Sequence, residues 1–167
     1  ANGESGIAPL LPGTHAYHRF AQCLEEVLRK LAIAIVRDGE GATKLVEITV
    51  EGARNNVDAT KAAKAVALSP LVKTAIHGED ANWGRIIAAV GYSGIEFDPA
   101  QCEIAINGAP ILAQNYVVPL ANHEANKSLF SDFIDLRIQL HAGEGKATVW
   151  TCDFSEQYVV INGSYRS

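Results

Sequence analysis

The segment "DGEGATK", residues 38–44, places one carboxylate, Glu40, between two glycines and ahead of a threonine and a lysine. Glycine-rich loops followed by Lys and Thr can hold phosphates through backbone N–H groups. The order here is wrong for a phosphate loop, because Thr43 precedes Lys44, the spacing is too short, and a helix precedes the loop while a strand follows it. A carboxylate beside glycines instead suits a small cationic ligand, although a solvated loop glutamate explains the same residues.

The histidines do not form a recognisable metal site. His15 and His18 are three residues apart at the start of a predicted helix, but no third ligand stands at a telling distance, and "NHEAN" lacks the second histidine of H-E-x-x-H. We therefore interpret all five as solvated or capping residues: His15, His18, His77, His123 and His141. The sequence also lacks G-x-S-x-G and any isolated pair of carboxylates, so no complete catalytic constellation is visible and no metal is expected.

Composition limits the class of protein. The chain has 167 residues, 48% of them hydrophobic, and can bury a real core. Its net charge of −5 argues against nucleic acid and anionic membranes as partners. Three cysteines without a C-x-x-C pair give no disulfide framework, and neither a membrane span nor a signal pattern appears, so a cytoplasmic location is expected. The lack of methionine fits either a trimmed initiator or a piece of a longer chain.

Two elements must position Glu40. His15–Asp38 has apolar residues at helical spacing, which predicts an amphipathic helix packed on an apolar partner. Gly39 follows where a left-handed helix cap is wanted. Lys44–Glu51 alternates apolar and polar residues, which predicts a half-buried strand, so Glu40 should lie in the turn between helix and strand.

Further helices follow. We predict one from about Val57 to Leu68, capped by Asn55 or Asn56 and ended before Pro70. The next segment reads as a short apolar stretch, a polar turn and a third helix that ends at Gly91.

The remainder is mostly β. Asn107-Gly108 predicts a hairpin with a two-residue type I′ turn. The strands at 133–140 and 147–154 are joined by "HAGEGK" and are expected to pair antiparallel. The chain is therefore predicted to have an α+β fold, with mixed or antiparallel sheets packed with helices. A polar "RNN" at 54–56 favours a domain boundary there, between residues 1–55 and 56–167.

Three long segments carry a family resemblance. "DGEGATKLVEITVEGA", "SPLVKTAIHGEDANWGRIIAAVG" and the ending "CDFSEQYVVINGSYRS", in this order, resemble the C-terminal part of the ornithine acetyltransferase/glutamate N-acetyltransferase family of arginine biosynthesis. The likeness extends over essentially the whole chain. It implies that residues 1–55 are the remainder of a catalytic αβ domain and that residues 56–167 form a C-terminal α+β domain with a substrate-binding tail.

The resemblance also implies a reaction. Members of the family cleave their own precursor and free a threonine that accepts the acetyl group of N-acetylornithine and passes it to glutamate. That threonine lies upstream of this chain, and Gly41-Ala42-Thr43 is not the cleavage site. The family thus implies an α chain and an upstream part of the β chain as partners in a heterotetramer, an inactive isolated chain, and no cofactor, with acetyl-CoA as a second acetyl donor in some members.

Three residues match substrate-binding positions of the family. The resemblance assigns Glu40 to an ammonium group of ornithine, and Asn162 and Ser167 to the substrate at the tail. Serine stands where the family more often ends in threonine. The alternative is a free-standing ligand-binding or interaction domain without catalysis, and an upstream Gly-Ala-Thr in the reading frame would favour the enzyme.

Overall fold

The computed structural model describes residues 3–165, which divide into two compact units between Ile35 and Val36. The first unit is dominated by the helix α1 (His15–Arg37), which confirms the predicted helix to within one residue. α1 has no buried residue, and its apolar face is exposed along its length, at Phe20, Leu24, Val27, Leu28, Leu31 and Ile35.

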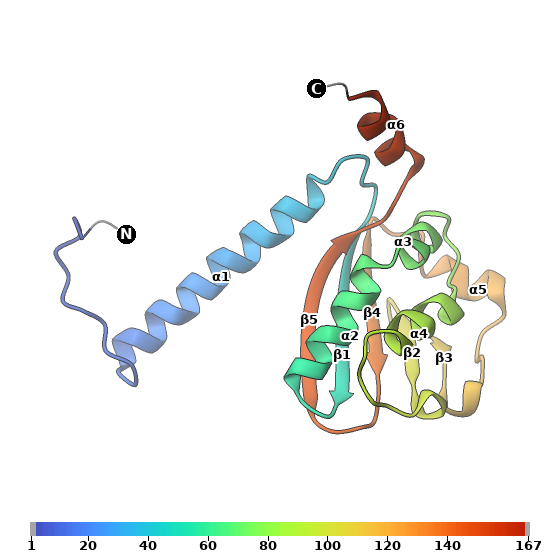
Figure 1. Cartoon of the computed structure of the whole chain (residues 1–167), viewed down its shortest axis with the longest axis horizontal. Coiled ribbons are helices and arrows are strands. Elements are labelled where there is room, and N and C mark those ends of the chain that lie inside the picture. The colour runs from blue at the N-terminus through green and yellow to red at the C-terminus, as the bar shows by residue number, and fades with distance from the viewer. Residues whose placement is uncertain (1–2, 166–167) are drawn as a thin grey trace. The chain divides into compact units, whose positions relative to one another are not determined.

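The second unit is built on one five-stranded sheet in the order β3-β2-β4-β1-β5 (Figure 1). Its strands are β1 (Leu45–Ala53), β2 (Glu103–Ile106), β3 (Ala109–Leu112), β4 (Phe133–Gln139) and β5 (Gly145–Cys152). β1 and β4 run parallel, and the other neighbours run antiparallel. The sheet is mixed and packs with helices, so the predicted α+β class is confirmed.

The predicted pairing of β4 with β5 is wrong, because β1 lies between them. Ile48 pairs with Leu136 of β4 on one side and with Val149 of β5 on the other. In the centre of the sheet, β1 has a hydrogen-bonded neighbour on both edges. One of its faces is also completely buried, since Val46, Ile48 and Val50 are fully buried. The connection between β4 and β5 therefore passes β1 instead of closing a hairpin.

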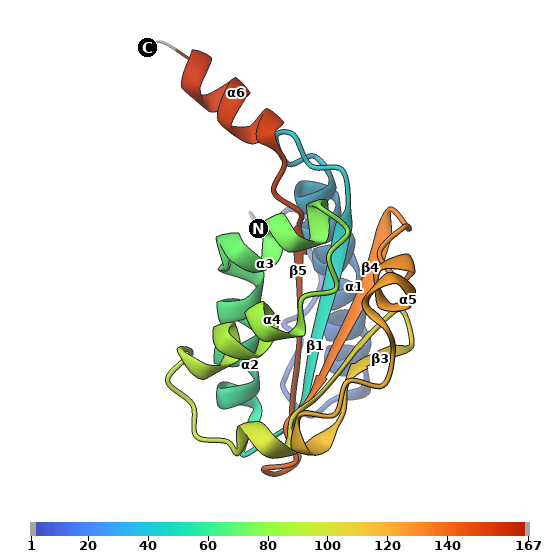
Figure 2. The same ribbon diagram turned by 90° about the vertical axis from the view of Figure 1, so that its right-hand side faces the viewer.

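Three helices cover one face of the sheet: α2 (Asn56–Leu68), α3 (Pro70–His77) and α4 (Trp83–Gly91) (Figure 2). The first and the last confirm predicted helices, and Asn55 caps α2 by accepting from the backbone N–H of Asp58. The alanines of α2 let it lie close to the sheet, and their side chains are fully buried at Ala59, Ala62 and Ala63.

α3 corrects the sequence reading, which expected only a short apolar stretch there. Ser69 closes α2 and also begins α3, since its hydroxyl accepts from the N–H of Val72 and Pro70 stands at the first position of the helix. Proline is favoured there because its missing N–H has no intrahelical partner to lose. The signal that ends one helix thus starts the next.

The remaining elements are short. Asn107 and Gly108 both have positive φ, at 48° and 80°, which confirms the tight turn between β2 and β3. One-turn 3₁₀ helices cover Pro99–Gln101 and Gln114–Tyr116, and α5 is Asn122–Lys127. α6 (Glu156–Ser164) begins after Ser155.

Two further points concern the whole chain. No helix within residues 3–165 is long and apolar enough to cross a membrane. The division of function between residues 1–55 and 56–167 stays a prediction, and β1 joins strands from beyond residue 56 in one sheet.

Candidate functional site

The loop that carries Glu40 depends on two glycines with different roles. Gly39 does not take the left-handed conformation that was predicted for it; a Cβ there would lie 3.3 Å from the Sγ of Cys152, so the loop passes close to β5. Gly41 is the left-handed residue, with φ at 71°. A Cβ on Gly41 would stand 2.7 Å from the backbone N of Tyr158, so only glycine allows this approach to α6.

Asp153 anchors the end of the loop. Its carboxylate is buried, and Oδ1 accepts from the backbone N–H of Thr43 at 2.7 Å and of Lys44 at 2.8 Å. Oδ2 accepts from the Thr43 hydroxyl at 2.6 Å. Burial by itself would raise the pKa of Asp153, but the donors from Thr43, Lys44 and His77 outweigh it and hold this pKa below the ordinary value of 3.8.

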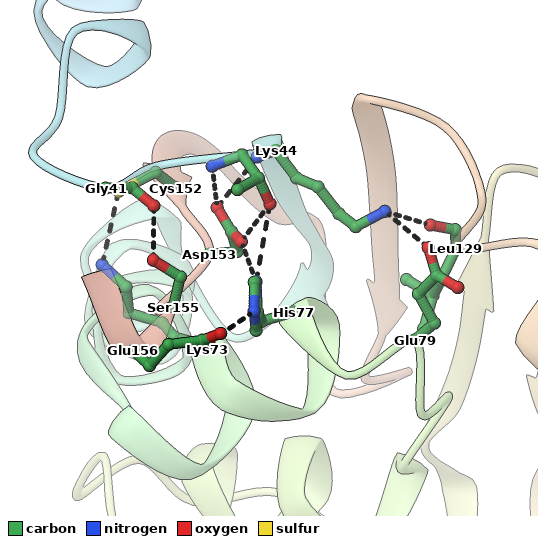
Figure 3. A network of polar contacts seen from close by, with 11 residues as sticks. Gly41, Lys44, Lys73, His77, Glu79, Leu129, Cys152, Asp153, Ser155 and Glu156 are labelled. Atoms are coloured by element: carbon green, nitrogen blue, oxygen red, sulfur yellow. Dashed lines mark hydrogen bonds and ion pairs between the residues drawn. The ribbon is translucent and has the colours of Figure 1, made fainter. Parts of the chain in front are cut away.

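His77 joins this anchor to α6 (Figure 3). Its Nδ1 lies 2.7 Å from Oδ2 of Asp153, and its Nε2 lies 3.2 Å from Oε2 of Glu156 in the first turn of α6. A hydrogen bond from its own backbone N–H to the carboxylate and the contact with His77 lower the pKa of Glu156. The imidazole therefore bridges two acidic groups from neighbouring segments.

A second tie holds α6 against the loop. The hydroxyl of Ser155 donates to the carbonyl of Gly41 at 2.6 Å. This bond and the close approach of Gly41 to Tyr158 fix the first turn of α6 beside residues 39–41. The segment that begins with Asp153 and the loop that follows α1 are therefore positioned as one substructure.

The structure brings two of the predicted site residues into contact. The amide Nδ2 of Asn162 donates to Oε2 of Glu40 at 2.7 Å, across 122 positions of sequence, and also to the carbonyl of Tyr158 at 2.9 Å. Both Glu40 and Asn162 are exposed. Ser167, the third predicted residue, lies outside the described residues, and its role stays a prediction.

A cavity of about 310 Å³ opens beside this contact. Its wall combines two acidic residues, one lysine, one cysteine and two aromatic residues. The lining residues are Gly39, Glu40, Leu68, Pro70, Lys73, Cys152, Asp153, Phe154 and Tyr158. A space of this size, with opposite charges among apolar atoms, can hold a small charged molecule such as an amino acid.

Sequence reasoning missed three residues of this arrangement. Asp153 is a lone acid after a strand, and its neighbours at the loop are about 110 positions away, so no local pattern marks it. His77 was interpreted as solvated or capping, whereas its ring pairs with two carboxylates. Lys73 was part of an apolar stretch. His77 and Lys73 both lie in the family motif "SPLVKTAIHGEDANWGRIIAAVG", but the motif alone indicates no contact partner for either side chain.

Comparison with known proteins gives a consistent result. A family model described as the ArgJ family matches residues 1–167. The arginine biosynthesis bifunctional protein ArgJ of Symbiobacterium thermophilum is 47% identical over 167 residues, which are 100% of this chain and 42% of that protein. The protein of the same name from Chlorobium chlorochromatii is 49% identical over 160 residues, 96% of this chain and 37% of that protein. The chain thus spans about two fifths of the length of these curated relatives.

A solved structure agrees. The crystal structure of the arginine biosynthesis bifunctional protein ArgJ from Bacillus halodurans superposes with a TM-score of 0.91 at 42% sequence identity, over 99% of this chain and 78% of that chain. The family model covers every residue, and the relatives share more than two fifths of their aligned positions. The chain belongs to the ArgJ family.

Proposed function

We propose that this chain is the substrate-binding C-terminal part of an N-acetyltransferase of arginine biosynthesis, which moves an acetyl group from N-acetylornithine to glutamate. Its relatives are named as bifunctional proteins of arginine biosynthesis, which supports the pathway. The observation that carries the proposal is the contact between Glu40 and Asn162 at the edge of a cavity of amino-acid size. Both residues match substrate-binding positions of the family.

Glu40 is suited to bind an ammonium group. Its carboxylate has about four acceptor positions, and the one described side-chain donor to it is the neutral amide of Asn162. That bond orients the carboxylate without neutralising its charge. An ammonium group that docks there makes a charge-assisted hydrogen bond, which contributes about 1.5 to 3 kcal/mol. The side-chain ammonium of N-acetylornithine is the natural candidate, because its α-amine carries the acetyl group.

The chemical step belongs to the rest of the enzyme. The threonine nucleophile is expected on an upstream segment of the β chain, where its own α-amine activates the hydroxyl, and the oxyanion donors are expected on the α chain. On this proposal the present chain binds and orients substrate, and it is inactive without its partners. No cofactor is needed, and acetyl-CoA can serve as a second acetyl donor to the same threonine.

The two substrates make opposite demands on one site. Glutamate carries a second carboxylate where ornithine carries an ammonium group. A carboxylate about 4 Å from Glu40 is repelled by about 4 kcal/mol at the effective dielectric of a protein surface. A site that accepts both molecules in turn therefore needs a positive group near Glu40 as well.

The test is Glu40→Gln in the complete enzyme, with both chains present. Glutamine keeps the shape and the bond to Asn162 but removes the charge, so the KM for N-acetylornithine should rise about tenfold or more, which is about 1.4 kcal/mol. Glu144→Gln is the matched control, since Glu144 is exposed in the loop before β5. An unchanged KM in the Glu40 variant would show that Glu40 does not bind the ammonium group of the substrate.

A further inference from the structure

The cavity beside Glu40 contains a lysine whose charge is not neutralised. Lys73 extends from α3, and its Nζ lies 3.4 Å from the hydroxyl of Thr151. The same Nζ lies 3.7 Å from the Sγ of Cys152 (Figure 3). The ammonium group also stands 5.8 Å from the centre of the Phe154 ring. Thr151, Cys152 and Phe154 are neutral partners, and no carboxylate within residues 3–165 forms an ion pair with Lys73.

The neighbouring lysine shows the opposite arrangement. Lys44 is buried, and its Nζ pairs with Oε1 of Glu79 at 3.1 Å and donates to the carbonyl of Leu129 at 2.7 Å. The charge of Lys44 is therefore neutralised by a carboxylate of the protein itself. Lys73 instead is half-buried and is held by contacts that leave its charge available to a ligand.

The turn of α3 that carries Lys73 is also held in place. The backbone N–H of Phe154 donates to the carbonyl of Lys73 at 3.3 Å, which ties this turn of α3 to the segment after β5. The Phe154 ring packs edge-on against Tyr158 of α6, with ring centres 4.5 Å apart. Lys73 and Glu40 therefore line one cavity from α3 and from the loop after α1, and they form no ion pair with each other.

We propose that Lys73 binds the side-chain carboxylate of glutamate, the acetyl acceptor, in the cavity where Glu40 binds the side-chain ammonium of the donor. The inference rests on the proposed function. A fixed carboxylate and a fixed ammonium that do not neutralise each other let one cavity receive a cationic side chain first and an anionic one afterwards. Each substrate pairs with the group of opposite charge.

Lys73 acts on the second half of the reaction. In that step the acetyl C–O bond to the threonine breaks and a C–N bond to the α-amine of glutamate forms. The proton that the amine loses goes to the threonine oxygen, so the free enzyme is restored. Lys73 takes no part in bond making; it holds the acceptor so that its amine faces the acetyl group.

The experiment measures the two half-reactions, acetylation of the enzyme and transfer to glutamate, separately in the complete enzyme. The enzyme is acetylated with N-acetylornithine carrying a labelled acetyl group, freed of the donor, and then mixed with glutamate at concentrations below saturation. In Lys73→Met, which keeps the apolar stem, transfer to glutamate should slow about tenfold to a hundredfold. Acetylation by N-acetylornithine should change by less than about threefold, since that step depends on Glu40. Lys73→Arg should retain more transfer than Lys73→Met because it keeps the charge.

Two comparisons keep the test sharp. Lys64→Met removes an exposed charge from α2, away from the lining of this cavity, and should leave both steps unchanged. Glutamine has the shape of glutamate without its charge, so the unmodified enzyme should transfer acetyl to glutamate at least about tenfold faster than to glutamine. Lys73→Met should reduce that preference.

The outcomes distinguish a failure of the Lys73 inference from a failure of the proposed function. If N-acetylornithine does not acetylate the unmodified complete enzyme, the proposed function fails. If the acetyl-enzyme forms but glutamate and glutamine remove the acetyl group equally well, Lys73 does not bind the acceptor carboxylate. That second result needs no variant, so it overturns the inference even where Lys73→Met does not fold. An equal slowing of both half-reactions in a folded Lys73→Met enzyme would also overturn it.

Discussion

Two carboxylates near the junction of the loop and α6 have opposite surroundings. Asp153 is buried and is surrounded by donors from Thr43, Lys44 and His77. Glu40 is exposed and has one described side-chain partner, the amide of Asn162. The first carboxylate is saturated and can only hold structure, whereas the second retains acceptor positions for a ligand.

The difference shows how a loop and a segment near the chain end can form a defined structure. Loops and chain ends are ordinarily the least constrained parts of a protein. Here Asp153, His77 and the hydroxyl of Ser155 fix the loop and the start of α6 to each other, so that Glu40 and Asn162 meet. The buried carboxylate supplies the positioning, and the exposed one keeps the acceptor positions that the proposed ammonium group would use.

The largest effect should come from removing the buried carboxylate. Asp153→Ala leaves the N–H groups of Thr43 and Lys44 without their acceptor, and we expect the free energy of unfolding to fall by about 3 to 5 kcal/mol. For a chain of this size that corresponds to a Tm about 10 °C lower or more. Asp132→Ala, which removes an exposed carboxylate before β4, is the control and should change the Tm by about 2 °C or less. A similar Tm for both variants would remove the distinction between the two regions.

Acid should weaken the same anchor. Because folding lowers the pKa of Asp153, its contribution to stability is fully present above the ordinary value of 3.8 and is lost as the pH falls through the lower pKa of the folded protein. The Tm of the unmodified protein should therefore fall more steeply below about pH 4 than that of Asp153→Asn. The two curves, measured by thermal unfolding between neutral and strongly acidic pH, should converge in acid. Parallel curves would show that Asp153 does not titrate with folding.

The parts of the fold that the sequence predicted are those with local signals. The helix α1 follows from apolar spacing, and the β2–β3 turn follows from Asn107-Gly108, both within a few residues. The position of β1 between β4 and β5 could not be predicted from local signals. It depends on which strand is stabilised most by pairing with a neighbour on both edges. Strand order is a property of the assembled sheet.

The residues of the candidate site show the same contrast between local signals and contacts made by distant segments. Glu40 and Asn162 were selected through their place in long family motifs, and the structure shows that they touch, although their roles stay predictions. Asp153 and Lys73 carry no local mark, because their surroundings are built from segments far apart in the chain. The family motifs thus indicated Glu40 and Asn162, whereas the surroundings of Asp153 and Lys73 become visible only in the folded structure.

The smallest effect should come from the exposed side of the comparison. Asn162→Ala removes the amide that orients Glu40, but neither residue is buried, so the Tm should change by about 2 °C or less. In the complete enzyme the KM for N-acetylornithine should rise about threefold to tenfold, because Glu40 keeps its charge and loses its fixed position. A double-mutant cycle identifies the cause. If Asn162 acts by holding Glu40, then Asn162→Ala should have little further effect in an enzyme that already carries Glu40→Gln. Independent, additive effects of the two substitutions would mean that Asn162 meets the substrate itself and that its bond to Glu40 is incidental.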